Sequence, residues 1–159
     1  MYLKERVIIG TVWLLCLISL RFIPKSKYRE ASFILLFAQL PSWILGLCVV
    51  EGNMIAYPVR LLWKANATNF CFEYLVLPFI CIFFNVYYPN TKSTLRKVFY
   101  YFCILSGFTL VEMLVEKYTK ILTYIHWQWF YTSISMFLLL YLVRIVYKWF
   151  FHLPRPFSL

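Results

Sequence analysis

Five apolar runs, each close in length to a membrane-crossing helix, constrain this chain more than any other feature. They cover residues 7–23, 31–50, 69–88, 98–116 and 129–151, and roughly 20 apolar helical residues span a bilayer. The sequence is 63% hydrophobic and only 14% charged, which is far more apolar than a soluble domain. We therefore predict an all-α fold: a single integral membrane domain over residues 1–159, built as a polytopic transmembrane helical bundle of about five membrane-spanning helices with a candidate interfacial helix.

The first run, residues 7–23, has the uncharged core of a signal peptide. However, no small-residue cleavage site follows it, and more basic residues follow it than precede it. We expect this run to be retained as the first helix of the bundle.

Proline and charged residues within the runs predict local features. Pro41 in the second run is expected to kink its helix, because the ring removes a backbone donor and clashes with the preceding turn. Arg144 and Lys148 in the fifth run are expected to extend toward the membrane interface. The third run also holds Glu73, Pro78 and Asn85.

The basic residues between the runs predict the orientation of the chain in a plasma membrane. On the side of the N-terminus there are six: Lys4, Arg6, Arg60, Lys64, Lys117 and Lys120. On the opposite side there are ten: Arg21, Lys25, Lys27, Arg29, Lys92, Arg96, Lys97, Arg144, Lys148 and Arg155. Because cytoplasmic loops are richer in Lys and Arg, we expect the N-terminus outside and the C-terminus in the cytoplasm.

The sequence allows more than one conformation for the two connections on the side of the N-terminus. The segment YPVRLLWKA, residues 57–65, has apolar and basic residues at helix-like spacing and is the candidate interfacial helix. The segment 118–128 either lies in the interface in the same way or extends the fourth helix beyond the membrane.

Two glutamates lie inside the predicted spans. Glu73 is four residues into the third run, and Glu112 is four residues from the end of the fourth. Because these helices are antiparallel, both carboxylates are expected roughly 6 Å below the outer boundary. A charged group at that depth is costly unless it is paired or neutralised, so each carboxylate needs a partner.

Two roles for the glutamate pair stay open. In a packing role, a protonated carboxyl or an ion pair with Arg60, Lys64 or Lys117 links neighbouring helices. In a functional role, the pair forms a proton, cation or ligand site that is open to the outside.

Glu116 and His126 complete the candidate polar site. Glu116 lies one turn beyond Glu112 and is expected to pair with Lys120 in a solvated interface. His126 lies between aromatic residues in the run YIHWQW. It is either an interfacial side chain or, because its ordinary pKa is near neutrality, part of a proton relay.

Catalytic and metal-binding signatures are missing from the sequence. It has no Asp, no HExxH, no P-loop and no GxGxxG, and its five cysteines form no CxxC pair. The net charge of +10 comes from basic residues between the apolar runs, where they determine the topology and meet anionic lipid headgroups. We expect no cofactor, no bound metal and no nucleic-acid partner.

Three stretches follow one another along the chain: FEYLVLPFICIFFNVYYPNTKSTLRKVFYY, EMLVEKYTKILTYIHWQWFYTSISMF and YLVRIVYKWFF. In their order and spacing, residues 55–151 resemble a family of small multi-span membrane proteins of spore-forming Firmicutes such as Bacillus and Clostridium, to which no activity is assigned. The resemblance implies a bacterial inner-membrane protein connected with sporulation or the cell envelope. It brings no catalytic residues.

Three functions are consistent with these patterns. The leading hypothesis is a small non-enzymatic integral membrane protein, a helical bundle in the lipid bilayer that binds a membrane protein partner, a second copy of itself as a homo-oligomer, or lipid. The alternative is a small transporter, channel subunit or sensor with Glu73, Glu112 and His126 as an outward-facing site. The third is an intramembrane enzyme acting on a lipid or isoprenoid, with a carboxylate as general acid or base.

Overall fold

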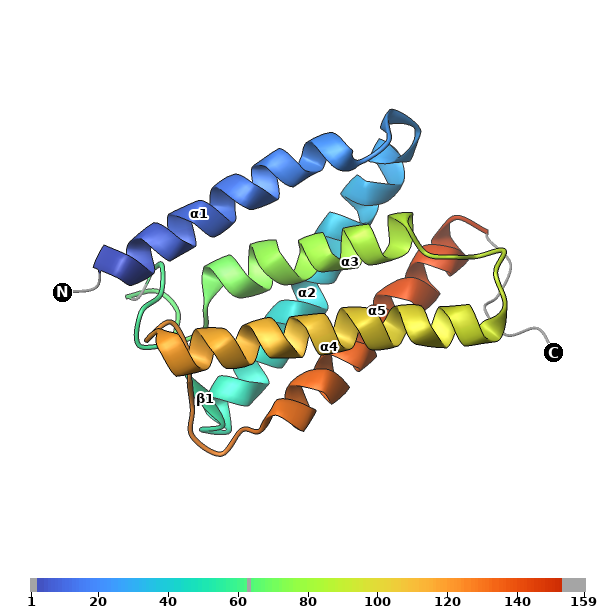
Figure 1. The fold of residues 1–159 in the computed structure, drawn as a ribbon. Helices are drawn as coiled ribbons and strands as arrows, with labels where there is room; N and C mark the ends of the chain where they lie inside the picture. The colour runs from blue at the N-terminus through green and yellow to red at the C-terminus, as the bar shows by residue number, and fades with distance from the viewer. Residues whose placement is uncertain (1–2, 63, 153–159) are drawn as a thin grey trace.

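The computed structural model, which describes residues 3–62 and 64–152, is a bundle of α-helices (Figure 1). The predicted all-α bundle is therefore confirmed. Its elements are α1 (Leu3–Ser19), short helices at Leu20–Phe22 and Lys25–Lys27, α2 (Tyr28–Glu51), β1 (Ile55–Ala56), a π-helix at Phe72–Val76, α3 (Leu77–Val86), α4 (Thr94–Tyr118), β2 (Thr123–Tyr124) and α5 (Trp129–Phe150).

Within the described residues, three helices are long and apolar enough to cross a membrane: Lys25–Glu51, Thr94–Tyr118 and Trp129–Phe150. The sequence predicted five such helices. The other two are shorter, since α1 has 17 residues and the apolar helix of the third run covers Phe72–Val86. A 17-residue helix rises about 25 Å, slightly less than the roughly 30 Å hydrocarbon core. The chain is thus a helical membrane protein with three helices of full spanning length.

The core lies where α2, α3 and α5 pack together. Small side chains, Ala38 on α2 and Cys81 on α3, are completely buried there, and they let the two helices approach closely. Phe84 and Leu140 fill the space toward α5. The flanking helices α1 and α4 bury only a few side chains each, so most of their apolar surface faces the surroundings of the bundle (Figure 1).

Pro78 determines how α3 begins and how it packs on α2. The Leu77 amide donates to the carbonyl of Phe72, five residues back, which makes this turn a π-helix. The next residue, Pro78, has no amide hydrogen, so this turn of the helix lacks one backbone donor. Two α2 side chains replace it: the Ser42 hydroxyl lies 2.7 Å from the Glu73 carbonyl, and the Gln39 amide donates to the Tyr74 carbonyl at 3.1 Å.

Pro41 lies inside α2, which continues as one helix from Tyr28 to Glu51. The helix therefore tolerates this proline without ending. The polar residues beside it, Gln39 and Ser42, are the ones that bond α3, so this part of α2 is specialised for the seam between the two helices.

Arg144 differs from its sequence-based prediction, because it is buried rather than extended toward the interface. Its side chain is 1% exposed, and its guanidinium donates to the Asn85 side-chain oxygen at 3.2 Å and to that of Asn90. It also stacks on Tyr88, with 3.8 Å between Cζ and the ring centroid. Lys148, one turn further, is buried as well. The connection between α3 and α4 covers this end of α5 and supplies the polar partners that a buried guanidinium needs.

The α2–α3 and α4–α5 connections form a two-stranded sheet instead of interfacial helices. β1 and β2 pair antiparallel, with Ile55 opposite Tyr124 and Ala56 opposite Thr123. The described part of 57–65 consists of turns, with Leu62 at a positive φ of 58°, so the predicted interfacial helix at 57–65 is wrong. In the other connection, α4 ends at Tyr118. Residues 118–128 therefore neither form an interfacial helix nor extend α4, and they contain the short strand β2.

We predict that Arg144→Ala destabilises the fold. The substitution leaves the side-chain oxygen of the buried Asn85 without its donor, at about 1–3 kcal/mol, whereas the exposed Asn90 can bond water instead. Thermal unfolding of the purified protein in a mild detergent measures the effect. Arg21→Ala is the matched control, since Arg21 is exposed and its loss should cost less than about 0.5 kcal/mol. Equal melting temperatures for the two variants would contradict the structural role of Arg144.

Candidate functional site

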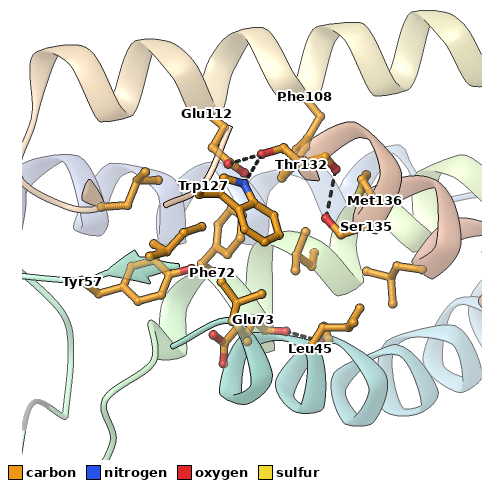
Figure 2. Close-up of a pocket in the computed structure, with 17 residues that line it drawn as sticks. Leu45, Tyr57, Phe72, Glu73, Phe108, Glu112, Trp127, Thr132, Ser135 and Met136 are labelled. Atoms are coloured by element: carbon orange, nitrogen blue, oxygen red, sulfur yellow. Dashed lines mark hydrogen bonds between the residues drawn. The ribbon is translucent and has the colours of Figure 1, made fainter. Parts of the chain in front are cut away.

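A small cavity of about 60 Å³ lies between α2, α4, α5, the π-helix and the paired connections. Figure 2 shows the side chains that surround it. A water molecule needs about 10–15 Å³ of such space, so the cavity has room for several water molecules or one small polar group. Most of its walls are apolar, and its two charged side chains are Glu73 and Glu112.

Glu112 enters this cavity from α4 and is held by hydroxyl donors. Its Oε1 accepts a hydrogen bond of 2.7 Å from Tyr124 and one of 2.6 Å from Thr132. The Thr132 hydroxyl in turn accepts from Nε1 of Trp127 at 2.7 Å. Three segments therefore meet at one carboxylate oxygen: α4, the second connection and the first turn of α5.

Glu73 enters the cavity from the π-helix and has a very different environment. Its side chain is 1% exposed, and both carboxylate oxygens are buried without a hydrogen-bond partner. An unpaired carboxylate inside a membrane protein is costly and usually marks a functional site. Glu73 is therefore the one acidic group of the cavity whose bonding capacity the described residues leave unused.

Gly46 of α2 makes the space that Glu73 occupies. A Cβ atom added at Gly46 would overlap Oε1 and Cδ of Glu73. Any larger residue would force the carboxyl group to move. The close approach of Glu73 thus explains why a glycine stands at position 46 of α2.

Two tyrosines on the paired connections, Tyr57 and Tyr124, lie near the carboxylates. Burial raises the pKa of Tyr57, and the charges of Glu73 and Glu112 raise it further. Burial also raises the pKa of Tyr124, to which the hydrogen bond with Glu112 adds. Both phenols therefore remain protonated at neutral pH. The pairing of β1 with β2 brings these tyrosines to the same site.

A second, larger cavity of about 440 Å³ adjoins the first one. It lies between α1, α3 and α4 and is lined mainly by aliphatic side chains, with Gly107 of α4 in its wall. Five residues line both cavities: Tyr57, Phe72, Phe108, Glu112 and Leu122. Glu112 thus lies on the boundary between the cavity that contains Glu73 and a larger, aliphatic one.

The structure brings together two of the six residues predicted for the polar site, Glu73 and Glu112, on one cavity. Glu116 is half-buried on α4 and lines neither cavity. His126 is exposed, and its backbone amide donates to the Met54 carbonyl at 3.2 Å. Instead of His126, its neighbour Trp127 enters the site.

The two basic candidates lie elsewhere. Arg60 stabilises its own connection by donating to the carbonyls of Tyr57, at 2.6 Å, and Asn66, at 2.8 Å. Lys64 is exposed. From the sequence we expected a basic residue or Glu73 as the partner of Glu112. In the structure its partners are the hydroxyl groups of Tyr124 and Thr132.

Sequence reasoning missed most of the side chains that form the site. They are Ser42, Gly46, Tyr57, Tyr124, Trp127 and Thr132. A signal existed only for Gly46, as an isolated glycine within an apolar helix. Within the described residues, no group of three or more His, Cys or Glu side chains is arranged to hold a metal ion.

We predict that Gly46→Ala destabilises the protein, because the added methyl group overlaps the Glu73 carboxyl group. Overpacking of this kind costs about 1–3 kcal/mol. Gly10→Ala is the matched control, since a Cβ there meets no atom within 4 Å. Thermal unfolding should show a large difference between the two variants, and adding Glu73→Ala to Gly46→Ala should restore stability. A double variant no more stable than Gly46→Ala would contradict the close packing of Gly46 on Glu73.

We also predict that Thr132→Val disrupts the network around Glu112. The isosteric valine leaves the indole N–H of Trp127 without its acceptor and removes one donor from Glu112, at about 1–3 kcal/mol. The altered surroundings of Trp127 should shift the tryptophan emission of the protein. Because the chain has six tryptophans, the spectrum of Trp127→Phe shows which part of the emission comes from Trp127. Thr11→Val is the control, because the exposed Thr11 hydroxyl bonds only its own helix at Val7. Identical stability and emission in the two valine variants would show that the network contributes nothing.

Protein-family models, curated proteins and solved structures give no match to this chain. What the protein does must therefore follow from the residues that line its two cavities.

Proposed function

We propose that this chain is a non-enzymatic membrane protein that binds one lipid-like amphiphile within its bundle. The apolar chain of the ligand lies in the larger cavity, and its polar end reaches the carboxylate of Glu112. Of the partner classes considered from the sequence, lipid is the one that this geometry favours.

One observation carries the proposal: the cavity of about 440 Å³ between α1, α3 and α4. This size falls within the range of about 300–1,000 Å³ that small-molecule sites occupy. Its walls are apolar from Ile8 and Val12 on α1 to Ile104 and Val111 on α4. A cavity of this chemistry inside a membrane protein suits an alkyl or isoprenoid chain, since water has few polar partners there.

The shared wall between the cavities supports an amphiphile rather than a plain hydrocarbon. Glu112 and Tyr57 line both spaces, so a ligand in the apolar cavity meets polar groups at its outer end. Specific sites combine a large apolar surface with a few polar groups that fix orientation. The described surroundings of Glu112 are hydroxyl donors, which fits binding better than nucleophilic chemistry.

The proposal includes a location and an orientation. All five helices cross the plasma membrane of a bacterium, with the two shorter ones extended by their interfacial ends. The N-terminus and the paired connections are outside, and the C-terminus is in the cytoplasm, in keeping with the excess of Lys and Arg on that side. The resemblance of residues 55–151 to membrane proteins of spore-forming Firmicutes agrees with such a location.

We predict that Gly107→Phe abolishes retention of the ligand. The new side chain has open space around it at this position and fills the apolar cavity that Gly107 lines. Native mass spectrometry of the protein, released from a nonionic detergent after gentle extraction, measures the bound lipid. The wild-type chain should carry one tightly held amphiphile, which Gly107→Phe loses.

Gly10→Phe provides the control for this experiment. Gly10 has equally open surroundings but does not line either cavity, so this variant should keep the ligand. Loss from both variants, or from neither, would contradict binding in the cavity between α1, α3 and α4. A wild-type protein that carries no lipid at all would contradict the proposed function itself.

A further inference from the structure

The unused bonding capacity of Glu73 identifies the kind of group that the smaller cavity accepts. Glu73 is 1% exposed and has two oxygens without a donor, whereas Glu112 in the same cavity has two hydroxyl donors on one oxygen. A carboxylate is an acceptor only. The Thr68 side chain and the Asn69 backbone lie near Glu73, but neither carboxylate oxygen has a hydrogen-bond partner. A ligand that brings N–H or O–H donors would therefore complete the bonding of Glu73.

The charges around the cavity favour a positively charged ligand. Both charged side chains that line it are acidic. The nearest basic residue of the connection, Arg60, uses its guanidinium on the backbone carbonyls of Tyr57 and Asn66. An anionic headgroup would meet two carboxylates here, and a neutral one would leave their charge unbalanced.

The walls of the cavity favour an organic cation over a metal ion. Tyr57, Phe72, Phe108 and Trp127 line it, and aromatic faces attract ammonium groups. Hard metal ions instead need six or more oxygen ligands, which these walls do not supply. The ligand is thus a nitrogen cation.

A primary amine answers the remaining requirement, which is for hydrogen-bond donors. A protonated primary amine has three N–H donors, enough for both oxygens of Glu73, while Glu112 on the opposite side of the cavity adds its negative charge (Figure 2). A quaternary ammonium has the same charge and suits aromatic walls, but it has no N–H and would leave Glu73 unpaired.

We infer that the Glu73–Glu112 cavity binds the protonated primary amine of an amphiphile whose apolar chain lies in the adjoining cavity. This inference rests on the proposed function and names its ligand class: aliphatic or isoprenoid amines and lipids with a terminal primary amine. Glu112 and Tyr57 line both cavities, so they lie beside the carbon atoms that join the amine to the apolar chain of the ligand.

Three probes of equal chain length test this inference: dodecylammonium, dodecyltrimethylammonium and dodecanol. Each is added at the same concentration to the full-length protein in nonionic detergent, and native mass spectrometry gives the bound fraction. We expect at least about tenfold tighter binding of dodecylammonium than of the other two probes, which corresponds to about 1.4 kcal/mol.

The variants Glu73→Gln and Glu112→Gln separate the headgroup from the chain. Each should lower dodecylammonium binding about tenfold or more and leave dodecanol binding unchanged, which also shows that the variant is folded. Glu116→Gln is the matched control, because Glu116 lies one turn from Glu112 but lines neither cavity. It should bind all three probes as the wild-type chain does.

Each result has a distinct meaning. Equal binding of dodecylammonium and dodecanol, or tighter binding of dodecyltrimethylammonium, would overturn the assignment of a primary amine while leaving an amphiphile site intact. An equal loss of dodecylammonium in Glu116→Gln would show surface attraction and would also overturn it. Failure of all three probes to bind would overturn the proposed function together with this inference.

Discussion

Hydrocarbon offers no partner to a polar group, so every polar atom inside the bundle depends on the protein itself. This constraint acts most directly where α3 begins. Pro78 supplies no backbone donor there, and Ser42 and Gln39 of α2 donate to the carbonyls of Glu73 and Tyr74. The contact between α2 and α3 is therefore fixed by hydrogen bonds as well as by the small side chains Ala38 and Cys81. The position of Glu73 follows from it, because Glu73 is part of the same π-helical turn and faces Gly46.

The same constraint separates structural polar groups from the functional candidate. Arg144 is as deeply buried as Glu73, but two asparagine side chains and a tyrosine ring accommodate its guanidinium. Glu112 likewise has two hydroxyl donors. Glu73 alone among the buried carboxylates of the described residues has both oxygens unsatisfied. Three buried nitrogens also lack a partner, Nε1 of Trp13, Nε1 of Trp43 and Nε of Arg144. Glu73 differs from them because it has two unpaired acceptor oxygens and lines a cavity, which suits a ligand with donors.

The fold could be predicted further from the sequence than the site could. Apolar runs of near-membrane length indicate helices regardless of what they pack against, and five helices do lie in those runs. The depth of Glu73 and Glu112 in their runs indicated a common level by the helical rise alone. Their partners could not be predicted, because Tyr124 and Thr132 reach Glu112 only when β1 and β2 pair across a long stretch of sequence. The failures at 57–65 and Arg144 have a similar origin, since helix-like spacing and snorkelling are local arguments. The pairing of the connections and the asparagines over α5 are tertiary features that override them.

The way α1 is held explains how a ligand from the bilayer could reach the apolar cavity. At the N-terminal end of α1, Lys4 donates to the carbonyl of Tyr118 at the end of α4. At the other end, the Tyr87 hydroxyl donates to the carbonyl of Phe22 just beyond α1, at 2.5 Å. Between these hydrogen bonds, Ile9 is buried, and its neighbours Ile8, Val12, Trp13 and Cys16 pack against the same apolar cluster. The cavity lies along α1 and α4 and is partly open. For the amphiphile proposed above, entry from the side between these helices needs no passage of a charged group through hydrocarbon.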